Sequence, residues 1–472
     1  MSSADRARTY ATGGLIAWAA FAFGAVYPWG YVPLAIGAVV LGGLGLPANR
    51  TSFQPSFTTI ATALVLAAVA LQLVPLAVPS LATLSPGSQR VLTATDVGYA
   101  IGARATHPLS VSADRTMLGL AAFAMLLVWC ASTAAIVRKA PALQAVAGGV
   151  VLVGACLAVV GLAQQATFNG KLLWFWTPRF YATNAFGPFV NRNHFAGWML
   201  LAIALGVGWL FGRIGDASGL RAPTWRERIL WLGSKQATPL IVVGAAVIVM
   251  ACALVWTMSR SGIAATGVAL AILLAAALRR SKRTLRRLVL AGYLVMTVAG
   301  VIAWRGEHTL ASWYRNTTTL EWRVRLWEDT MPALKEFWLT GSGVNTYGTV
   351  MLVYPRTDTS VQPREAHNDY LQMAVEGGLL VCVPAVLLVV AVGRAISARL
   401  RQPQSETAWW IRMGAVAGIC GMAVQELTEF SLQIPAVALL FVTCVAIAIH
   451  QPAQAPARRV RPQPAGALVT SI

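Results

Sequence analysis

Three short polar segments, each with a cationic or titratable side chain, interrupt long apolar stretches. These segments are Asn191-Arg192-Asn193-His194, Ser259-Arg260-Ser261 and His367-Asn368-Asp369-Tyr370. A guanidinium removed from water needs an anion or strong hydrogen bonding, and planar guanidinium groups match phosphate oxygens. A neutral imidazole can accept a proton near neutral pH. The residue types therefore indicate a site that binds a phosphate-like anion with two arginines and transfers a proton with a histidine.

Each arginine also has a plain interfacial interpretation. Arg260 lies in a turn too short to carry it far from the bilayer boundary, so lipid headgroups or a specific phosphate would neutralise it. Arg192 could equally stand at the start of a helix as an interfacial residue. Two arginines at one membrane face would form a bidentate clamp for a diphosphate. The neighbouring side chains that could share this anion or a sugar are Asn191, Asn193, His194, Ser259 and Ser261.

His367 is either a general base or an interfacial histidine that caps a helix. If it is a base, Asn368 or Asp369 could orient the imidazole or the substrate. Glu376 would lie about two and a half helical turns deeper in the same span. A carboxylate at that depth is costly, so we expect Glu376 to pair with an arginine.

Membrane-spanning helices must position these residues. Of the 472 residues, 57% are hydrophobic and only 11% are charged, and the mean hydropathy is +0.63. A span needs about 20 mostly apolar residues. The predicted fold class is an all-α polytopic membrane protein with about 12 transmembrane helices and outer loops at 79–115 and 305–372, the longer loop lying between helices 9 and 10. The predicted spans are 12–28, 31–46, 58–78, 116–137, 143–166, 194–212, 239–258, 261–278, 287–304, 373–393, 408–425 and 433–450.

The net charge of +20 is explained by membrane topology. If the N-terminus is cytoplasmic, seven alternating cytoplasmic segments hold nearly all of the excess Lys and Arg, and the outer segments are almost neutral. We therefore expect cytoplasmic N- and C-termini and no nucleic-acid partner. We expect one membrane domain over residues 1–451 and a disordered cytoplasmic tail over 452–472.

Part of the second outer loop is predicted to be an amphipathic helix packed on the membrane domain, over residues 320–337. Arg323 and Arg325 on this helix could reach a phosphate or a glycan. Its predicted packing face consists of Leu320, Val324, Trp327, Met331 and Leu334, which recur at helical spacing.

Several cofactor-dependent chemistries have no support in the sequence. There is no phosphate-binding G-x-x-x-x-G-K-[ST] loop, and Gly341-Ser342-Gly343 lacks the third glycine of a dinucleotide site. No H-E-x-x-H pair or D-x-D motif occurs, and the five histidines are scattered. We expect neither a cofactor nor a metal site.

From Phe189 onward, the order of the polar motifs resembles the O-antigen ligase and O-antigen polymerase superfamily. Each motif is short, but all of them fall at one predicted membrane face, and a long outer loop precedes the histidine. The motifs are Asn191-Arg192-Asn193-His194-Phe195-Ala196, Ser259-Arg260-Ser261-Gly262, Arg323-Val324-Arg325-Leu326-Trp327, Gly341-Ser342-Gly343-Val344 and His367-Asn368-Asp369-Tyr370-Leu371.

The resemblance implies a membrane glycosyltransferase of the GT-C type in the bacterial inner membrane, with a periplasmic active site. Its donor would be an undecaprenyl-diphosphate-linked glycan, and its acceptor a hydroxyl of lipid A-core, a protein or another glycan, in lipopolysaccharide or surface-glycan biosynthesis. Arg192 and Arg260 match the arginines that hold the diphosphate, and His367 matches the histidine that activates or positions the acceptor. We predict transfer with inversion and without a metal, because arginines can stabilise the leaving diphosphate.

The family motif after the histidine places a glycine where Gly378 stands, and a Gly, Thr or Tyr where this chain has Val381. That departure concerns helix packing more than chemistry. Glycan ligation is the first prediction, and polymerisation of lipid-linked repeat units is the alternative, because both would use the same donor site. A polysaccharide or lipid transporter ranks third, since nearly every ionisable residue lies at a predicted span end rather than near the bilayer midplane.

Overall fold

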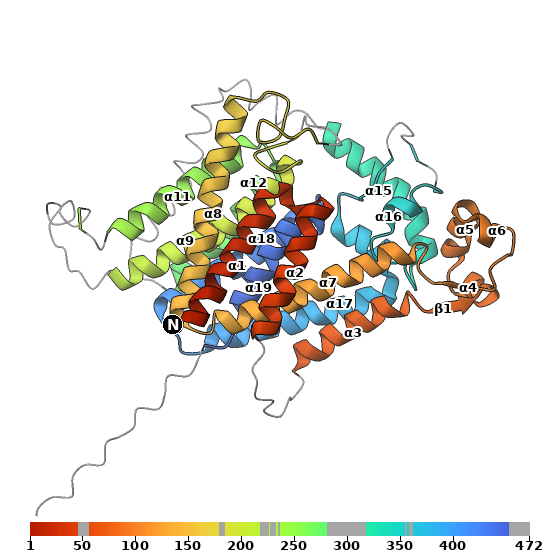
Figure 1. The fold of residues 1–472 in the computed structure, drawn as a ribbon, viewed down its shortest axis with the longest axis horizontal. Helices are drawn as coiled ribbons and strands as arrows, with labels where there is room; N and C mark the ends of the chain where they lie inside the picture. Colours follow the sequence, from red (N-terminus) through yellow and green to blue (C-terminus); the bar gives the residue numbers. More distant parts are fainter. Residues whose placement is uncertain are drawn as a thin grey trace, which may run out of the picture.

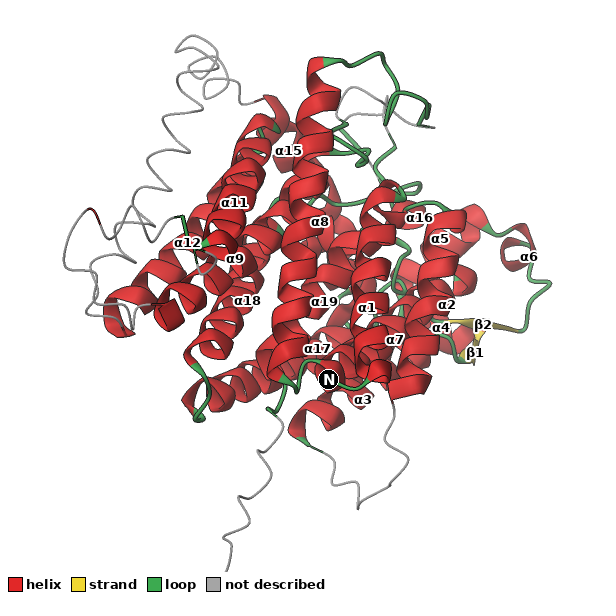
Figure 2. Cartoon of the chain, turned by 60° about the vertical axis from the view of Figure 1, so that its left-hand side comes forward, coloured by secondary structure: helices red, strands yellow, loops and turns green. Residues whose placement is uncertain are grey.

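The computed structural model is an all-α bundle in which long helices run side by side (Figures 1 and 2). It describes residues 1–45, 56–178, 185–217, 226, 233–234, 237–280, 318–354, 356–357 and 362–452. Among these residues, seven helices are long and apolar enough to cross a membrane, and three shorter helices are also apolar. The predicted class of all-α polytopic membrane protein is confirmed.

A helix lies at each predicted span that the structure describes. The predicted span 287–304 and residues 453–472 of the predicted tail lie outside the described residues. The bundle consists of α1 (Ser3–Phe21), α2 (Pro28–Gly45), α3 (Phe57–Leu71), α7 (Ala113–Ile136), α8 (Ala140–Ala166), α9 (Arg192–Ala217), α11 (Thr238–Trp256), α12 (Arg260–Arg280), α17 (Asp369–Arg401), α18 (Glu406–Gln425) and α19 (Pro435–Ile449).

Two predicted boundaries need correction. The first span was expected at 12–28, but α1 ends at Phe21 and a 3-10 turn, η1 (Phe23–Ala25), follows, because Gly24 adopts a positive φ of 73°. The third was expected to continue to residue 78, but α3 ends at Leu71. Residues Pro75–Ala77 instead form strand β1, which pairs antiparallel with β2 (Thr106–Pro108).

The described parts of the two predicted outer loops pack together into a lobe at one end of the bundle, away from the N-terminus (Figure 1). We call the described residues of 75–111 and 318–366 the outer lobe and this end of the bundle the outer end. Besides the two strands, the lobe contains α4 (Val78–Leu84), α5 (Pro86–Thr95), α6 (Val97–Ala100), α15 (Thr318–Phe337) and α16 (Tyr347–Val350). The Val111 N–H donates to the Ser342 carbonyl at 2.9 Å, which joins the two segments.

The amphipathic helix was predicted correctly, but its packing face was predicted only in part, because of the predicted face only Trp327 and Leu334 are partly buried. Leu320, Val324 and Met331 are exposed on α15. The buried residues are Leu326, Thr330, Ala333 and Phe337, which are also spaced as one helical face. Thr330 tolerates burial because its hydroxyl hydrogen-bonds to the Leu326 carbonyl and the Tyr347 hydroxyl, both at 2.7 Å. The buried face is therefore rotated by roughly a quarter turn from the face that apolar spacing indicated.

Glycines bring the backbones of α9 and α18 into direct contact. A Cβ at Gly208 would lie 2.4 Å from the Trp410 carbonyl oxygen, and one at Gly414 would lie 2.6 Å from the Ala204 carbonyl oxygen. Small residues at such positions allow the close approach that stabilises helix pairs in membranes. Helix α9 is almost completely enclosed by its neighbours. The packing fixes the outer ends of α9 and α18 relative to each other.

A buried carboxylate attaches the outer lobe to α17. Glu376 accepts hydrogen bonds from the backbone N–H groups of Asn345 (2.8 Å) and Tyr347 (2.9 Å) and from the Gln372 side chain (3.1 Å). The expected arginine partner was therefore wrong. Gly341 approaches so closely that a Cβ there would lie 2.1 Å from the Glu376 carbonyl oxygen. Glu376 and the Gly341-Ser342-Gly343 motif thus hold the lobe that carries α15.

Candidate active site

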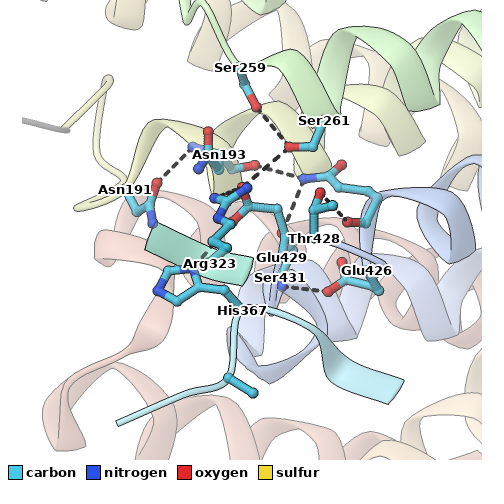
Figure 3. A network of polar contacts seen from close by, with 12 residues as sticks. Asn191, Asn193, Ser259, Ser261, Arg323, His367, Glu426, Thr428, Glu429 and Ser431 are labelled. Carbon is cyan, nitrogen blue, oxygen red and sulfur yellow. Dashed lines mark hydrogen bonds and ion pairs between the residues drawn. The ribbon is translucent and has the colours of Figure 1, made fainter. Parts of the chain in front are cut away.

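The central group of the candidate site is the Glu429 carboxylate, in the turn between α18 and η3 (Ser431–Gln433) (Figure 3). Its side chain is 1% exposed. Glu429 Oε1 accepts from Arg323 Nη2 at 2.5 Å and from Ser261 Oγ at 3.3 Å. Burial raises the pKa of Glu429, and the neighbouring Arg323 opposes this by favouring the charged form. Three segments far apart in the sequence, 261, 323 and 429, therefore meet at one carboxylate.

His367 faces this carboxylate from the segment that enters α17. Its Nδ1 lies 4.0 Å from Glu429 Oε2, and the His367 side chain is 21% exposed. The ring makes edge contacts with Trp322 and Phe430, with centroids 5.3 and 4.8 Å away. Burial, and then the positive charge of Arg323, lower the pKa of His367 to about 3. The imidazole is therefore neutral at neutral pH and able to accept a proton.

The backbone on both sides of His367 is fixed by side chains. The Ala366 N–H donates to Gln372 Oε1, and the Ala366 carbonyl accepts from Trp327 Nε1, both at 2.9 Å. Asn368 caps α17 by accepting from the Leu371 N–H at 3.0 Å. Between these anchors His367 has a φ of 50°, which is uncommon for a residue other than glycine. This conformation sets the direction of the imidazole.

Many of the buried polar atoms that make no hydrogen bond lie in this cluster. Buried polar groups in native proteins are nearly always paired, so each exception needs an explanation. Within the described part of the chain, twelve buried side-chain N or O atoms make no hydrogen bond, and six of them lie here. These six atoms are His194 Nε2, Arg323 Nε, His367 Nδ1, Gln425 Oε1, Glu426 Oε1 and Glu429 Oε2. They include donors and acceptors that a polar ligand could use.

The two predicted anion-binding arginines stand at the first residues of two helices. Arg192 begins α9 and is exposed, and Arg260 begins α12 and is half-buried. Their neighbours join the cluster, because Ser261 donates to Glu429 and the Asn193 carbonyl accepts from Gln425 Nε2 at 3.0 Å. The N-terminus of a helix favours an anion through its free N–H groups and its dipole. Both arginines therefore lie where a bound anion would also meet a helix N-terminus.

The polar residues beside the two arginines have two roles: some cap the starts of α9 and α12, and others contact Glu429 or Phe430. Asn191 Oδ1 accepts from the Asn193 N–H at 2.9 Å at the start of α9, and Ser259 Oγ accepts from the Gly262 N–H at 3.3 Å at the start of α12. The Asn193 side chain interacts with the Glu429 carboxylate. His194 is buried against Phe430, with ring centroids 4.6 Å apart. Phe430 thus separates the rings of His194 and His367.

Three predicted site residues do not face Glu429. Arg325 is exposed, because it lies two residues from Arg323 and so on nearly the opposite side of α15. Asn368 uses its carbonyl oxygen as the cap of α17. Asp369 accepts from Gln433 Nε2 at 2.7 Å, and its N–H donates to the Glu426 carbonyl at 3.1 Å. Asn368 and Asp369 therefore support the backbone around His367.

The sequence reasoning missed the segment 425–431. Glu426 and Glu429 occur three residues apart at the outer end of an apolar helix. A carboxylate there is as costly as the arginines Arg192 and Arg260, which were selected for that reason. Burial and the nearby Asp369 raise the pKa of Glu426, whose Oε2 accepts from the Ser431 N–H at 2.8 Å. If acidic residues at the ends of apolar spans had been treated as site candidates, as the arginines were, this segment would have been selected.

The fold and the cluster define an integral membrane protein with a buried carboxylate, arginine and neutral histidine at one end of its helices. Residues 245–386 match the family described as O-antigen ligase. The matched region contains Arg260, Arg323 and His367, and the predicted resemblance is confirmed over this region at the level of the family. No curated protein matches the chain.

Proposed function

We propose that this protein transfers a glycan from an undecaprenyl-diphosphate-linked donor to an acceptor hydroxyl at the periplasmic face of the bacterial inner membrane. The observation that carries the proposal is the neutral His367, which lies within the O-antigen ligase region. Its Nδ1 lies 4.0 Å from the buried carboxylate of Glu429, which lies outside that region. In this orientation the outer lobe lies in the periplasm, and both termini lie in the cytoplasm.

In the proposed reaction, the acceptor oxygen attacks the anomeric carbon and the bond from that carbon to the diphosphate breaks. The acceptor proton passes to the His367 imidazole. The leaving diphosphate keeps the bonding electron pair, and Arg192, Arg260 and the N-termini of α9 and α12 stabilise its charge. A single displacement inverts the anomeric configuration. Product with retained configuration would contradict this step.

Glu429 and Arg323 have positioning roles in this scheme. A shortening of the 4.0 Å separation would let Glu429 accept a hydrogen bond from His367 Nδ1–H, which leaves Nε2 as the base. The negative charge of a bound diphosphate would also raise the pKa of His367 from its low value in the free protein. Donor binding would thereby turn a weak base into a more effective one.

The proposal favours ligation over polymerisation, because the matched family is described as O-antigen ligase. A deletion strain separates the two. Full-length polymer stranded on undecaprenyl diphosphate is the result expected for a ligase, and accumulation of single lipid-linked repeat units would show a polymerase. Unchanged surface glycan and lipid-linked intermediates would contradict both.

Substitution of Glu429 tests the site itself. We expect Glu429→Gln to lower the transfer rate by about tenfold or more while the protein still inserts, because a neutral amide cannot stabilise the protonated imidazole. The measurement is glycan transfer by the variant in the deletion strain and in purified membranes. Glu406→Gln, at the opposite end of α18, is the matched control and should retain transfer. A Glu429→Gln protein with the wild-type rate would remove Glu429 from the site.

A further inference from the structure

A second feature of the outer end is a cluster of aromatic rings in and beside two turns. One turn joins α1 to α2, and the other follows α8. The rings of Phe23 and Trp176 stack with centroids 5.2 Å apart, and those of Tyr27 and Trp29 stack with an interplanar angle of 9°. We call the cluster the aromatic platform; it consists of Trp18, Phe23, Tyr27, Trp29, Phe175 and Trp176.

The platform combines partly exposed aromatic residues with a fixed backbone. Trp29 is 42% exposed and Phe175 is 67% exposed. Four non-glycine residues of the two turns have positive φ values: Phe23 (57°), Ala25 (56°), Leu173 (46°) and Trp174 (67°). Such strained residues persist only where the surroundings enforce them, and they cluster at ligand sites.

Side chains hold the second turn in this strained shape. The Leu173 N–H donates to Gln164 Oε1 at 3.2 Å, and Trp174 Nε1 donates to Thr167 Oγ1 at 2.8 Å. Asn169 Nδ2 donates to the Trp174 carbonyl at 2.9 Å. Interfacial anchoring needs only that single rings reach the headgroup region. A set of rings stacked on one another in two braced turns serves better as a rigid binding surface.

The platform adjoins the candidate site on the side of Arg192. A Cβ placed on Gly24, within η1, would lie 3.4 Å from the Phe189 ring and 3.1 Å from Ile434. Phe189 stands three residues before Arg192, and its ring contacts that of Phe195 in α9, with centroids 5.8 Å apart. Buried packing therefore joins the platform to the segment that ends at Arg192, whereas α15 borders His367.

We propose that the aromatic platform binds the carbohydrate of the lipid-linked donor, by stacking pyranose C–H faces on the exposed rings of Trp29 and Phe175. This inference rests on the proposed function. A donor whose diphosphate is held at Arg192 must direct its sugars away from the membrane-embedded lipid, and the platform offers the adjoining apolar ring faces. Aromatic faces attract polarised C–H groups through their quadrupole.

Equilibrium binding tests the platform with the full-length protein in lipid nanodiscs, measured by isothermal titration calorimetry. The two probes are undecaprenyl diphosphate and the undecaprenyl-diphosphate-linked glycan purified from the deletion strain. Wild-type protein should bind the glycan-bearing lipid more tightly. Trp29→Ala and Phe175→Ala should each weaken that binding by about fivefold and leave the affinity for undecaprenyl diphosphate unchanged.

Matched variants separate stacking from anchoring. Trp29→Phe keeps a ring face and should retain most of the affinity for the glycan-bearing lipid. Trp338→Ala removes another exposed outer-end tryptophan, one outside the platform, and should bind both lipids like the wild type. Equal affinity of wild-type protein for the two lipids, or an unchanged preference in Trp29→Ala and Phe175→Ala, would overturn the platform proposal alone. Failure of undecaprenyl diphosphate to bind wild-type protein would instead contradict the proposed function.

Discussion

An arginine and a histidine lie near each end of helix α18, and the two pairs have different hydrogen-bond partners. Arg412 and His450 are buried, whereas Arg323 and His367 are half-buried. At the end remote from the outer lobe, Arg412 Nη1 donates to the Ala448 carbonyl at 2.6 Å and the His450 carbonyl at 3.2 Å. Arg412 Nε donates to Gln404 at 3.2 Å, and His450 Nδ1 hydrogen-bonds to the Ile447 carbonyl at 2.7 Å. These groups close the end of α19.

At the outer end, Arg323 and His367 meet Glu429 instead of carbonyl groups. Arg323 Nε, His367 Nδ1 and Glu429 Oε2 make no hydrogen bond within the described part of the chain. Burying an unpaired polar atom costs about 1–3 kcal/mol, so a cluster of such atoms is retained where a ligand or a reaction uses it. The contrast shows that burial of an arginine and a histidine does not by itself mark a site. The unused hydrogen-bonding capacity marks it.

The contrast is tested most strongly by removing each histidine. His367→Ala should lower the transfer rate by about 100-fold or more, because it removes the proposed base. His450→Ala should leave transfer within about threefold of wild type, since it removes only a helix-end contact. The measurement is glycan transfer in membranes that contain equal amounts of each variant. Equal losses in the two variants would mean that both ends of α18 are structural.

Substitution of Arg412 tests the other half of the contrast, namely that this end of α18 contributes to stability and not to ligand binding. Arg412→Met should lower the free energy of unfolding by about 3 kcal/mol, because hydrogen bonds from a charged donor contribute about 1.5–3 kcal/mol and two buried carbonyls lose their donor. The apparent melting temperature of the purified protein should fall, and undecaprenyl diphosphate binding should persist at low temperature. Unchanged thermal stability would show that the Arg412 contacts contribute nothing.

The pH dependence gives the finest test. Neutral His367 is the active form, so kcat/KM, which reports the free protein, should decline only as pH falls toward the pKa of about 3. Arg323→Met removes a positive charge that lowers this pKa, so the acid decline should move to higher pH. Arg325→Met, on the exposed side of the same helix, should keep the wild-type profile. A wild-type half-maximum near pH 6.5 would contradict the lowered pKa of His367.

The sequence predicted the helical class, the positions of the described helices and the placement of Arg192 and Arg260 at helix starts. It also selected His367, because polar residues at the ends of apolar spans are few, and it selected Arg323 and Arg325 together because both lie on the predicted amphipathic helix. It did not separate Arg323 from Arg325, since Arg323 is recognised only by its contact with Glu429, which lies far away in the sequence.

Glu429 could not be placed next to His367 from spacing alone. The carboxylate reaches the cluster because α18 packs against α9 through Gly208 and Gly414, and against α12 through Gly421, where a Cβ would lie 2.8 Å from the Ala265 carbonyl oxygen. These contacts join segments that are distant in the chain. Glycine is also common in membrane helices for other reasons, so a glycine in the sequence does not show which helix packs against it.

The enclosure of α9 has a consequence for biogenesis. Helix α9 is made early, but α18, whose backbone fills the space beside its glycines, is nearly the last helix to leave the ribosome. Until then lipid must occupy the surface that later holds α18. Assembly of the candidate site is thereby delayed until almost the whole chain has been inserted. A chain cut short before α18 would carry Ser261, Arg323 and His367 without the carboxylate at which they meet.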